Sequence, residues 1–154
     1  MTKPLMHRIF LITFLLICSL GLSHAQELQS ELLVGEWKLV KNEAVDQIRS
    51  SNAYLSASPE KRLAMEERIK ILLSSSYYQF KEDKQVNFTD LESGAIVQRQ
   101  ATYHIENNVL SIKEIDRDRI KKAKITQLDE KTLILAPIIN GKEQEAKMIF
   151  ERWK

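Results

Sequence analysis

Apolar and polar residues alternate along most of the chain from Gly35 onward, in short segments separated by turn residues. A period of two is typical of a strand with one buried and one exposed face. Eight such segments follow one another, so the pattern predicts eight antiparallel strands. Their apolar positions are Trp37 and Leu39; Tyr78 and Phe80; Val86 and Phe88; Val97, Ala101, Tyr103 and Ile105; Leu110 and Ile112; Ala123 and Ile125; Leu133 and Leu135; and Ala146, Met148 and Phe150.

Short turns join nearly all of these segments. Asn107-Asn108 suits a two-residue hairpin, because asparagine accepts a positive φ, and Asn140-Gly141 is expected to join the last two strands. Further turns are expected at Glu82-Asp83-Lys84, Glu92-Ser93-Gly94 and Asp129-Glu130-Lys131. Strands linked in this way can close on themselves, which removes exposed sheet edges. The predicted fold class is all-β with one α-helix, an eight-stranded up-and-down antiparallel β-barrel.

One helix is expected after the first strand, over residues 59 to 74. Ser58 can cap it, Pro59 suits its first turn, and Glu60 complements the positive end of its dipole. An apolar stripe follows at helical spacing and consists of Met65, Ile69, Leu72 and Leu73. We expect this helix to lie across an open end of the barrel. The segment 42–57 reads either as a loop or as a further helical turn.

The N-terminus has the pattern of an export signal. Lys3 and Arg8 precede an apolar stretch over residues 9–20, and small residues lead up to Ala25, where a signal peptidase would cleave. The apolar stretch is shorter than the roughly twenty residues that cross a bilayer, so no membrane span is expected after cleavage. Ile17 in front of Cys18 argues against a lipid anchor there. Residues 1–25 are therefore expected to be a signal peptide.

The remaining residues 26–154 form one domain, expected to be periplasmic or extracellular. Without Lys3 and Arg8 the domain has 21 basic and 21 acidic residues, which gives no general nucleic-acid footprint. The only cysteine and two of the three histidines are lost with the signal. This inventory excludes disulfides, cysteine nucleophiles and cysteine-bound metals from the mature protein. We expect no cofactor and no metal.

Two short signatures lie at the ends of the predicted barrel. Gly35-Glu36-Trp37 begins the first strand, and Arg152 ends the last. Together they resemble small exported bacterial lipocalin-like domains of the calycin, or lipocalin-like, superfamily. The resemblance implies that Trp37 plugs the closed end of the barrel and that Arg152 packs across its face. The chain lacks the Thr-Asp-Tyr motif of typical secreted lipocalins.

Arg99 is the most informative residue of the long predicted strand 95–105. It alternates onto the same face as Ala101 and Tyr103, which places a guanidinium inside the barrel, where it needs a partner. Glu114, in phase with the apolar residues of the next strand, is the expected partner. Alternatively, Arg99 and Tyr103 bind the acidic head of an apolar ligand, or Arg99 reaches water at the rim.

The other candidate ligand-binding residues are large apolar or aromatic side chains on inward faces, where core and cavity wall coincide. They are Tyr78, Phe80, Phe88 and Met148. The basic run from Arg117 to Lys124 is interrupted by Asp118, so it is read as a solvated turn and edge rather than as an anion-binding surface. His104 faces outward with no convergent partners, and no catalytic residue is assigned.

Two functions remain open. The first is an exported, non-enzymatic binding protein that holds a small apolar or amphipathic, acid-headed ligand in the barrel. The second is an interaction module with a filled barrel, which docks on another exported protein. A cavity of roughly 300 Å³ or more with a few polar groups favours the first, and an interior without a gap favours the second.

Overall fold

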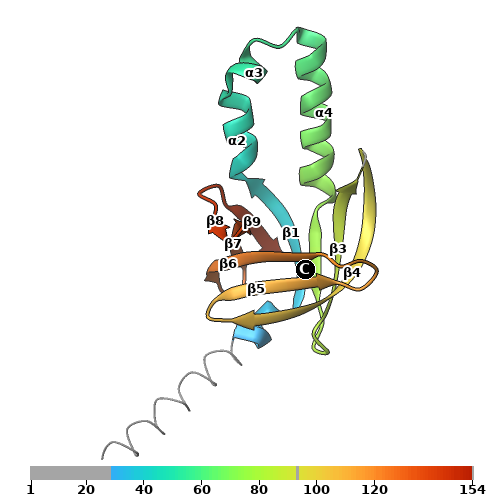
Figure 1. Cartoon of the computed structure of the whole chain (residues 1–154), viewed down its shortest axis with the longest axis vertical. Coiled ribbons are helices and arrows are strands. Elements are labelled where there is room, and N and C mark those ends of the chain that lie inside the picture. Colours follow the sequence, from blue (N-terminus) through green and yellow to red (C-terminus); the bar gives the residue numbers. More distant parts are fainter. Residues whose placement is uncertain (1–28, 93, 154) are drawn as a thin grey trace, which may run out of the picture.

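The computed structural model describes residues 29–92 and 94–153, and within them eight antiparallel strands close into a barrel (Figure 1). The expected signal peptide lies outside the described residues. The strand order runs β6-β5-β4-β3-β2-β1-β9-β7, and pairing between β6 and β7 closes the cylinder. The all-β fold class with eight main strands is confirmed. The strands are β1 (Gly35–Asn42), β2 (Tyr77–Phe80), β3 (Gln85–Glu92), β4 (Ala95–Glu106), β5 (Val109–Glu114), β6 (Ile120–Leu128), β7 (Thr132–Ile139) and β9 (Met148–Arg152), with a two-residue β8 (Lys142–Glu143) extending the β7 edge.

The expected hairpins have the backbone that their residues favour. Asn107 and Asn108 have φ of 50° and 62°, and Asn140 and Gly141 have φ of 52° and 76°. Positive φ at both central residues matches the twist of the flanking strands. One strand boundary differs from the prediction: Ala146 precedes β9, because the neighbouring Lys147 bonds to Glu43 at the start of a helix instead of joining the ladder.

Aromatic and aliphatic side chains fill the half of the barrel that leads to its closed end. Phe80 meets Tyr103 edge to face, with ring centroids 5.0 Å apart, and Tyr78 stacks on Phe80 at 5.5 Å. Tyr78 also contacts Phe88 and Phe150, with centroids 5.7 Å and 5.3 Å away. Because of these contacts, the half of the barrel that leads to the closed end is a packed core rather than a channel.

A short helical turn over residues 29–33 seals the closed end. Its Leu33 is fully buried, and the carbonyl of Leu33 accepts a hydrogen bond of 2.8 Å from the Trp37 indole N–H. The Arg152 guanidinium carbon lies 4.3 Å from the centroid of the Trp37 ring, which is the stacking that the resemblance implies. Arg152 also donates to the carbonyls of Leu32 and Val34, at 2.6 Å and 2.8 Å. The Arg152 side chain therefore joins β9, the last strand, to the segment that precedes β1.

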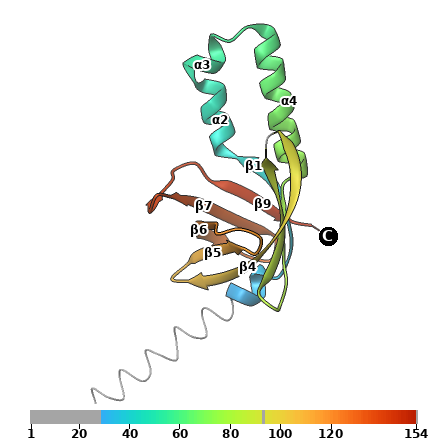
Figure 2. The ribbon, with the colours of Figure 1, turned by 45° about the vertical axis from the view of Figure 1, so that its right-hand side comes forward.

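The segment between β1 and β2 forms helices α2 (Glu43–Ser50), α3 (Asn52–Leu55) and α4 (Pro59–Ser75), which stand out from the barrel as a hairpin in Figures 1 and 2. The expected position of α4 across the open end is wrong. Its contacts with the barrel lie in its second half, where Ile69 is buried and Leu73 packs against the core, whereas the first half projects outward and leaves Leu63 exposed (Figure 1). In the described part of the chain, no helix is long and apolar enough to cross a membrane.

Candidate functional site

The end of the barrel opposite Trp37 contains a cavity of about 600 Å³. It lies between β1, β2, β3, β5, β6, β7 and β9, and the last turn of α4 reaches it through Leu72. Ligand sites of proteins are typically concave, mostly apolar and of several hundred cubic ångströms. The barrel is therefore filled at one end and hollow at the other.

Most of the cavity wall is apolar. The strands alternate buried and exposed positions, and the buried positions point into the barrel. Leu110 and Ile112 of β5 are two such buried residues. The aromatic ring of Tyr78 forms the floor where the packed half begins. The apolar lining residues of the strands include Leu39, Leu110, Ile112, Ala123, Leu135, Met148 and Phe150.

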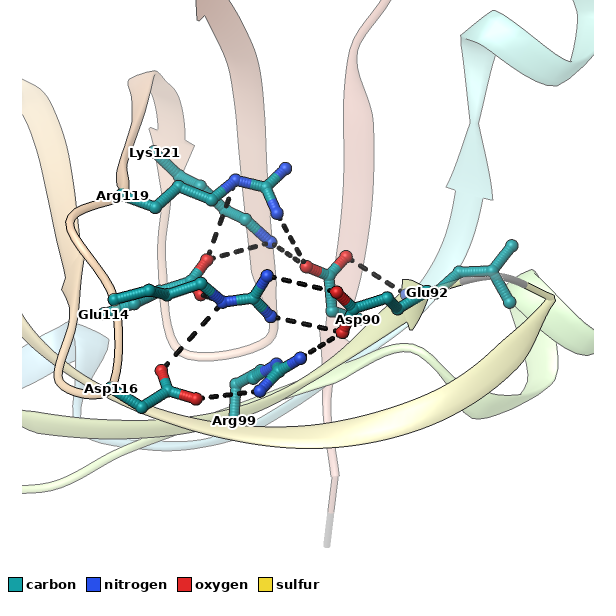
Figure 3. Close-up of polar contacts among 9 residues, drawn as sticks. Asp90, Glu92, Arg99, Glu114, Asp116, Arg119 and Lys121 are labelled. Atoms are coloured by element: carbon teal, nitrogen blue, oxygen red, sulfur yellow. Dashed lines mark hydrogen bonds and ion pairs between the residues drawn. The ribbon is translucent and has the colours of Figure 1, made fainter.

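One side of the cavity carries charges. Asp90, Arg119 and Lys121 line it, and they belong to a set of eight charged residues that we call the ionic cluster. The exposed Lys122 also lines the cavity but lies outside this set. The ionic cluster connects β3 and β4 to β5, β6 and the loop between β5 and β6 (Figure 3). Its members are the acids Asp90, Glu92, Glu114 and Asp116 and the bases Arg99, Arg117, Arg119 and Lys121. Four negative and four positive charges balance one another.

Glu114 is the most deeply buried member, with a side chain that is 0% exposed. Its carboxylate lies 2.6 Å from Arg117 Nε, 3.8 Å from Arg119 Nε and 3.9 Å from Lys121 Nζ. Neither Glu114 oxygen accepts an aligned hydrogen bond from the residues that the structure describes, so these three cations compensate it mainly by charge. A carboxylate without such compensation would be costly at this depth.

Asp90 faces the cavity and meets two cations. Its Oδ2 accepts a hydrogen bond from Lys121 Nζ at 2.9 Å and one from Arg119 Nη1 at 3.3 Å. Burial acts to raise the pKa of Asp90, but the hydrogen bond and charge of Lys121 and the charge of Arg119 outweigh it and lower the pKa overall. Lys121 also lies over the Phe88 ring, 4.5 Å from its centroid. The cavity wall thus presents an ion-paired carboxylate beside an ammonium and a guanidinium.

Comparison with known proteins identifies the family. Residues 33–135 match the family model of the lipocalin-like domain. The chain belongs to the lipocalin-like domain family. None of the curated proteins matches it.

Three solved structures to which the chain is similar come from Bacteroides species. A lipocalin-like protein from Bacteroides uniformis is 15% identical, with a TM-score of 0.48 over 79% of this chain and 99% of that chain. An uncharacterized protein from Bacteroides eggerthii is 13% identical, with a TM-score of 0.46 over 78% of this chain and 98% of that chain. A DUF4847 family protein from Bacteroides vulgatus is 18% identical, with a TM-score of 0.46 over 80% of this chain and 95% of that chain.

Arg99 lies inside this lipocalin-like barrel, but its partners differ from the expected one. Its side chain is 15% exposed, and its guanidinium contacts Glu92 and lies 2.8 Å from Asp116. Glu114, the partner expected from the sequence, contacts Arg117 instead. The pairing of β4 with β5 ends at Ala101 and Glu114. Beyond that pair, the loop between β5 and β6 returns across β4 and brings Asp116, rather than Glu114, next to Arg99.

The other candidate residues divide between the core and the cavity. Tyr78 and Met148 line the cavity. Burial raises the pKa of Tyr78 to about 12, with further contributions from the charges of Asp90 and Glu114, so its hydroxyl stays neutral. Phe80 and Phe88 are fully buried core residues. Tyr103 donates its hydroxyl proton to the Lys81 carbonyl at 2.9 Å, in the packed half.

Asp90, Arg119 and Lys121 of the cavity wall were not assigned to a binding site from the sequence. Arg119 and Lys121 belong to the basic run that the sequence analysis reads as a solvated turn and edge, but in the structure they line the cavity. The alternation of β6 contains a signal for one of them, since Lys121 is in phase with the buried Ala123 and Ile125. The alternation of β3 contains another, because Asp90 is in phase with the buried Val86 and Phe88. Arg119 precedes β6, and no periodic pattern points to it.

Proposed function

We propose that the protein is an exported binding protein that holds a small apolar or amphipathic molecule in the open half of its barrel. The observation that carries this proposal is the cavity of about 600 Å³, lined mainly by apolar side chains and polar on one side. A molecule bound there would bury its apolar part against side chains such as Leu110, Leu135 and Met148. Its polar end would meet the side where Asp90, Arg119 and Lys121 converge.

The cavity also separates the two functions that the sequence leaves open. A protein–protein interaction module with a filled barrel needs no internal space, because its contacts are made on the outer surface. A cavity of this size would be a cost to stability in such a module, since its apolar walls lack packing partners. The cavity therefore supports small-molecule binding over the filled-barrel alternative.

Export forms part of the proposal and rests on residues 1–25, with cleavage expected after Ala25. Native mass spectrometry of protein purified from its own host tests this and the ligand together. We expect a chain that begins at Gln26, with a bound small molecule of discrete mass. A chain that retains residues 1–25 would contradict the export proposal.

Binding in the cavity can be tested with the neutral dye Nile red, whose fluorescence rises in apolar surroundings. Ala123 faces the cavity from β6, so Ala123→Phe places a ring in the space that the dye would occupy. Thr126→Phe is the matched control, because Thr126 is exposed on the same strand. We expect Ala123→Phe to weaken dye binding by about tenfold or more, the effect of losing a few apolar contacts, and Thr126→Phe to leave it unchanged.

Equal dye affinity in the wild type and in folded Ala123→Phe would contradict the proposal, because the dye would then bind elsewhere. Thermal melting of both variants establishes that each is folded. The same titration with Thr126→Phe excludes an effect of adding an aromatic ring anywhere on β6.

A further inference from the structure

We infer that the ligand of this cavity has an anionic head, and that this head takes the place of the Asp90 carboxylate on Lys121 and Arg119. The inference rests on the proposed function, since it concerns which ligands the cavity selects. It makes Asp90 a built-in competitor of the ligand rather than a ligand-binding residue. The class of ligand is an amphiphile with a carboxylate or a similar single-charge head.

The geometry of Asp90 is that of a bound carboxylate head. A single oxygen, Oδ2, receives both Lys121 Nζ at 2.9 Å and Arg119 Nη1 at 3.3 Å. All three side chains line the cavity, so the two donors are accessible from the space that holds the apolar part of a ligand. A ligand carboxylate that reached them would meet a preformed pair of cationic donors, which is the arrangement that charge-assisted hydrogen bonds favour.

The charge balance of the ionic cluster favours exchange over addition, because the other cation of the wall, Lys122, is exposed and lies outside the cluster. Its four acids and four bases are already matched. A further carboxylate would add an uncompensated negative charge next to the fully buried Glu114. The electrostatic free energy of this repulsion would weaken ligand binding. If one carboxylate of the cluster leaves as the head arrives, the balance is kept.

Asp90 is the carboxylate of this wall that can leave. Its side chain is 21% exposed, whereas that of Glu114 is 0% exposed and lies among three cations. The second oxygen of Asp90, Oδ1, accepts only the N–H of the adjacent Leu91 at 3.1 Å among the described residues. A rotation of the Asp90 side chain toward water therefore breaks two ion pairs that the ligand head forms again.

The exchange predicts opposite effects for two substitutions in the same wall. Asp90→Asn removes the competing charge and keeps the shape of the side chain, so it should tighten the binding of decanoic acid at neutral pH by about tenfold. Lys121→Met removes a donor and keeps an apolar stem over Phe88, so it should weaken the binding of decanoic acid by about tenfold or more. Decanol has the same chain without a charge, and neither substitution should change its affinity by more than about twofold.

The measurement is displacement of Nile red from the wild type and both variants by decanoic acid and by decanol. Lys124→Met is the matched control, because Lys124 lies on the same strand but pairs with Glu143 on the outer surface, 3.0 Å away. We expect it to bind both compounds as the wild type does. Asp90→Ser serves as a second removal of the charge in case Asp90→Asn does not fold, and the same tightening is expected.

The outcomes separate this inference from the function on which it rests. If decanol displaces the dye while Asp90→Asn and Asp90→Ser bind decanoic acid no more tightly than the wild type, the exchange is refuted and cavity binding stands. If neither compound displaces the dye from any of the proteins, cavity binding itself is refuted. The exchange is supported if Asp90→Asn and Asp90→Ser bind decanoic acid, but not decanol, more tightly than the wild type, and if Lys121→Met binds decanoic acid more weakly.

Discussion

The guanidinium of Arg152 lies 4.3 Å from the ring centroid of Trp37 and closes the base of the barrel. Arg152 pairs with Trp37 in the register of β9 with β1, so the last strand reaches the first where the chain enters the barrel. Its Nε, Nη1 and Nη2 donate to the carbonyls of Glu130, Val34 and Leu32. This side chain thus fixes the position of three chain segments at once.

Gly35 makes this arrangement possible, and Gly35→Ala should destabilise the protein. Gly35 has φ of 130°, which side chains rarely adopt, and a Cβ there would overlap Arg152 Nη1. We expect a loss of about 2 to 4 kcal/mol in the free energy of unfolding, from backbone strain and displacement of Arg152. Urea denaturation measures it.

Gly141→Ala is the control for Gly35→Ala. Gly141 also has a positive φ, of 76°, but a Cβ there would have open space. It should therefore cost only about 1 kcal/mol, the strain of a left-handed backbone conformation at a residue with a side chain. Equal losses in the two variants would show that contact with Arg152 adds nothing.

Arg152→Lys should destabilise the protein although it keeps the positive charge. A lysine ammonium carries all its donors on one atom, so it cannot reach the three carbonyls that Arg152 reaches from three separate nitrogens, and it has no planar group to lie on the Trp37 ring. We expect a loss of about 2 kcal/mol, and about 3 kcal/mol for Arg152→Ala, which leaves all three carbonyls without this donor. The unfolding midpoints in urea measure both, and a Lys variant as stable as the wild type would show that charge alone matters.

The barrel itself was predictable from the sequence because alternation is a local property. Trp37 with Leu39, or Leu133 with Leu135, identifies a strand and its inner face without knowledge of any partner. The hairpin residues Asn107 and Asn108 add the turn by their own backbone preference. Such signals do not depend on where the rest of the chain lies.

The charged side of the cavity was harder to predict because it depends on a loop. Residues 115–119 return across β4, so Asp116 pairs with Arg99, and Arg117 pairs with Glu92 and Glu114. No period in the sequence specifies that path. The outward direction of α4 is similar, since its apolar stripe shows which face is buried but not that only the second half of the helix reaches the barrel.

Glu114→Leu tests whether the ionic cluster stabilises the fold. The substitution leaves Arg117, Arg119 and Lys121 without their buried counter-charge, although the volume of the side chain is nearly kept. We expect a loss of about 3 kcal/mol, the typical cost of breaking a buried ion pair from one side. Urea denaturation at low salt measures the effect.

Glu143→Gln provides the comparison for Glu114→Leu. Glu143 pairs with Lys124 on the surface, where both side chains are close to half exposed, and such pairs contribute little to stability. We therefore expect almost no change in the unfolding midpoint. If Glu114→Leu also left the unfolding midpoint unchanged, the ionic cluster would not contribute to the stability of the fold.

Acid should loosen the helical hairpin through Glu66. Arg49 donates to both oxygens of Glu66, at 2.9 Å and 2.6 Å, and Tyr54 donates its hydroxyl proton at 2.7 Å. These hydrogen bonds, from Arg49 first and then Tyr54, lower the pKa of Glu66 from 4.5 to about 2. A carboxyl whose pKa is lower in the folded state stabilises the fold above its ordinary pKa, and this stabilisation is lost as the pH falls through the folded value.

The loss is therefore expected between about pH 4.5 and about pH 2, and Glu66→Gln should remove it. Hydrogen exchange at the amides of α2 and α4, corrected for the intrinsic rate at each pH, measures the opening of the hairpin. We expect the difference in protection between the wild type and Glu66→Gln to be largest at neutral pH and to vanish toward pH 2. Glu67→Gln removes a neighbouring exposed charge without touching Arg49 or Tyr54, and should leave protection at neutral pH unchanged. A difference between the wild type and Glu66→Gln that stays constant down to pH 2 would show that these contacts do not hold α2 against α4.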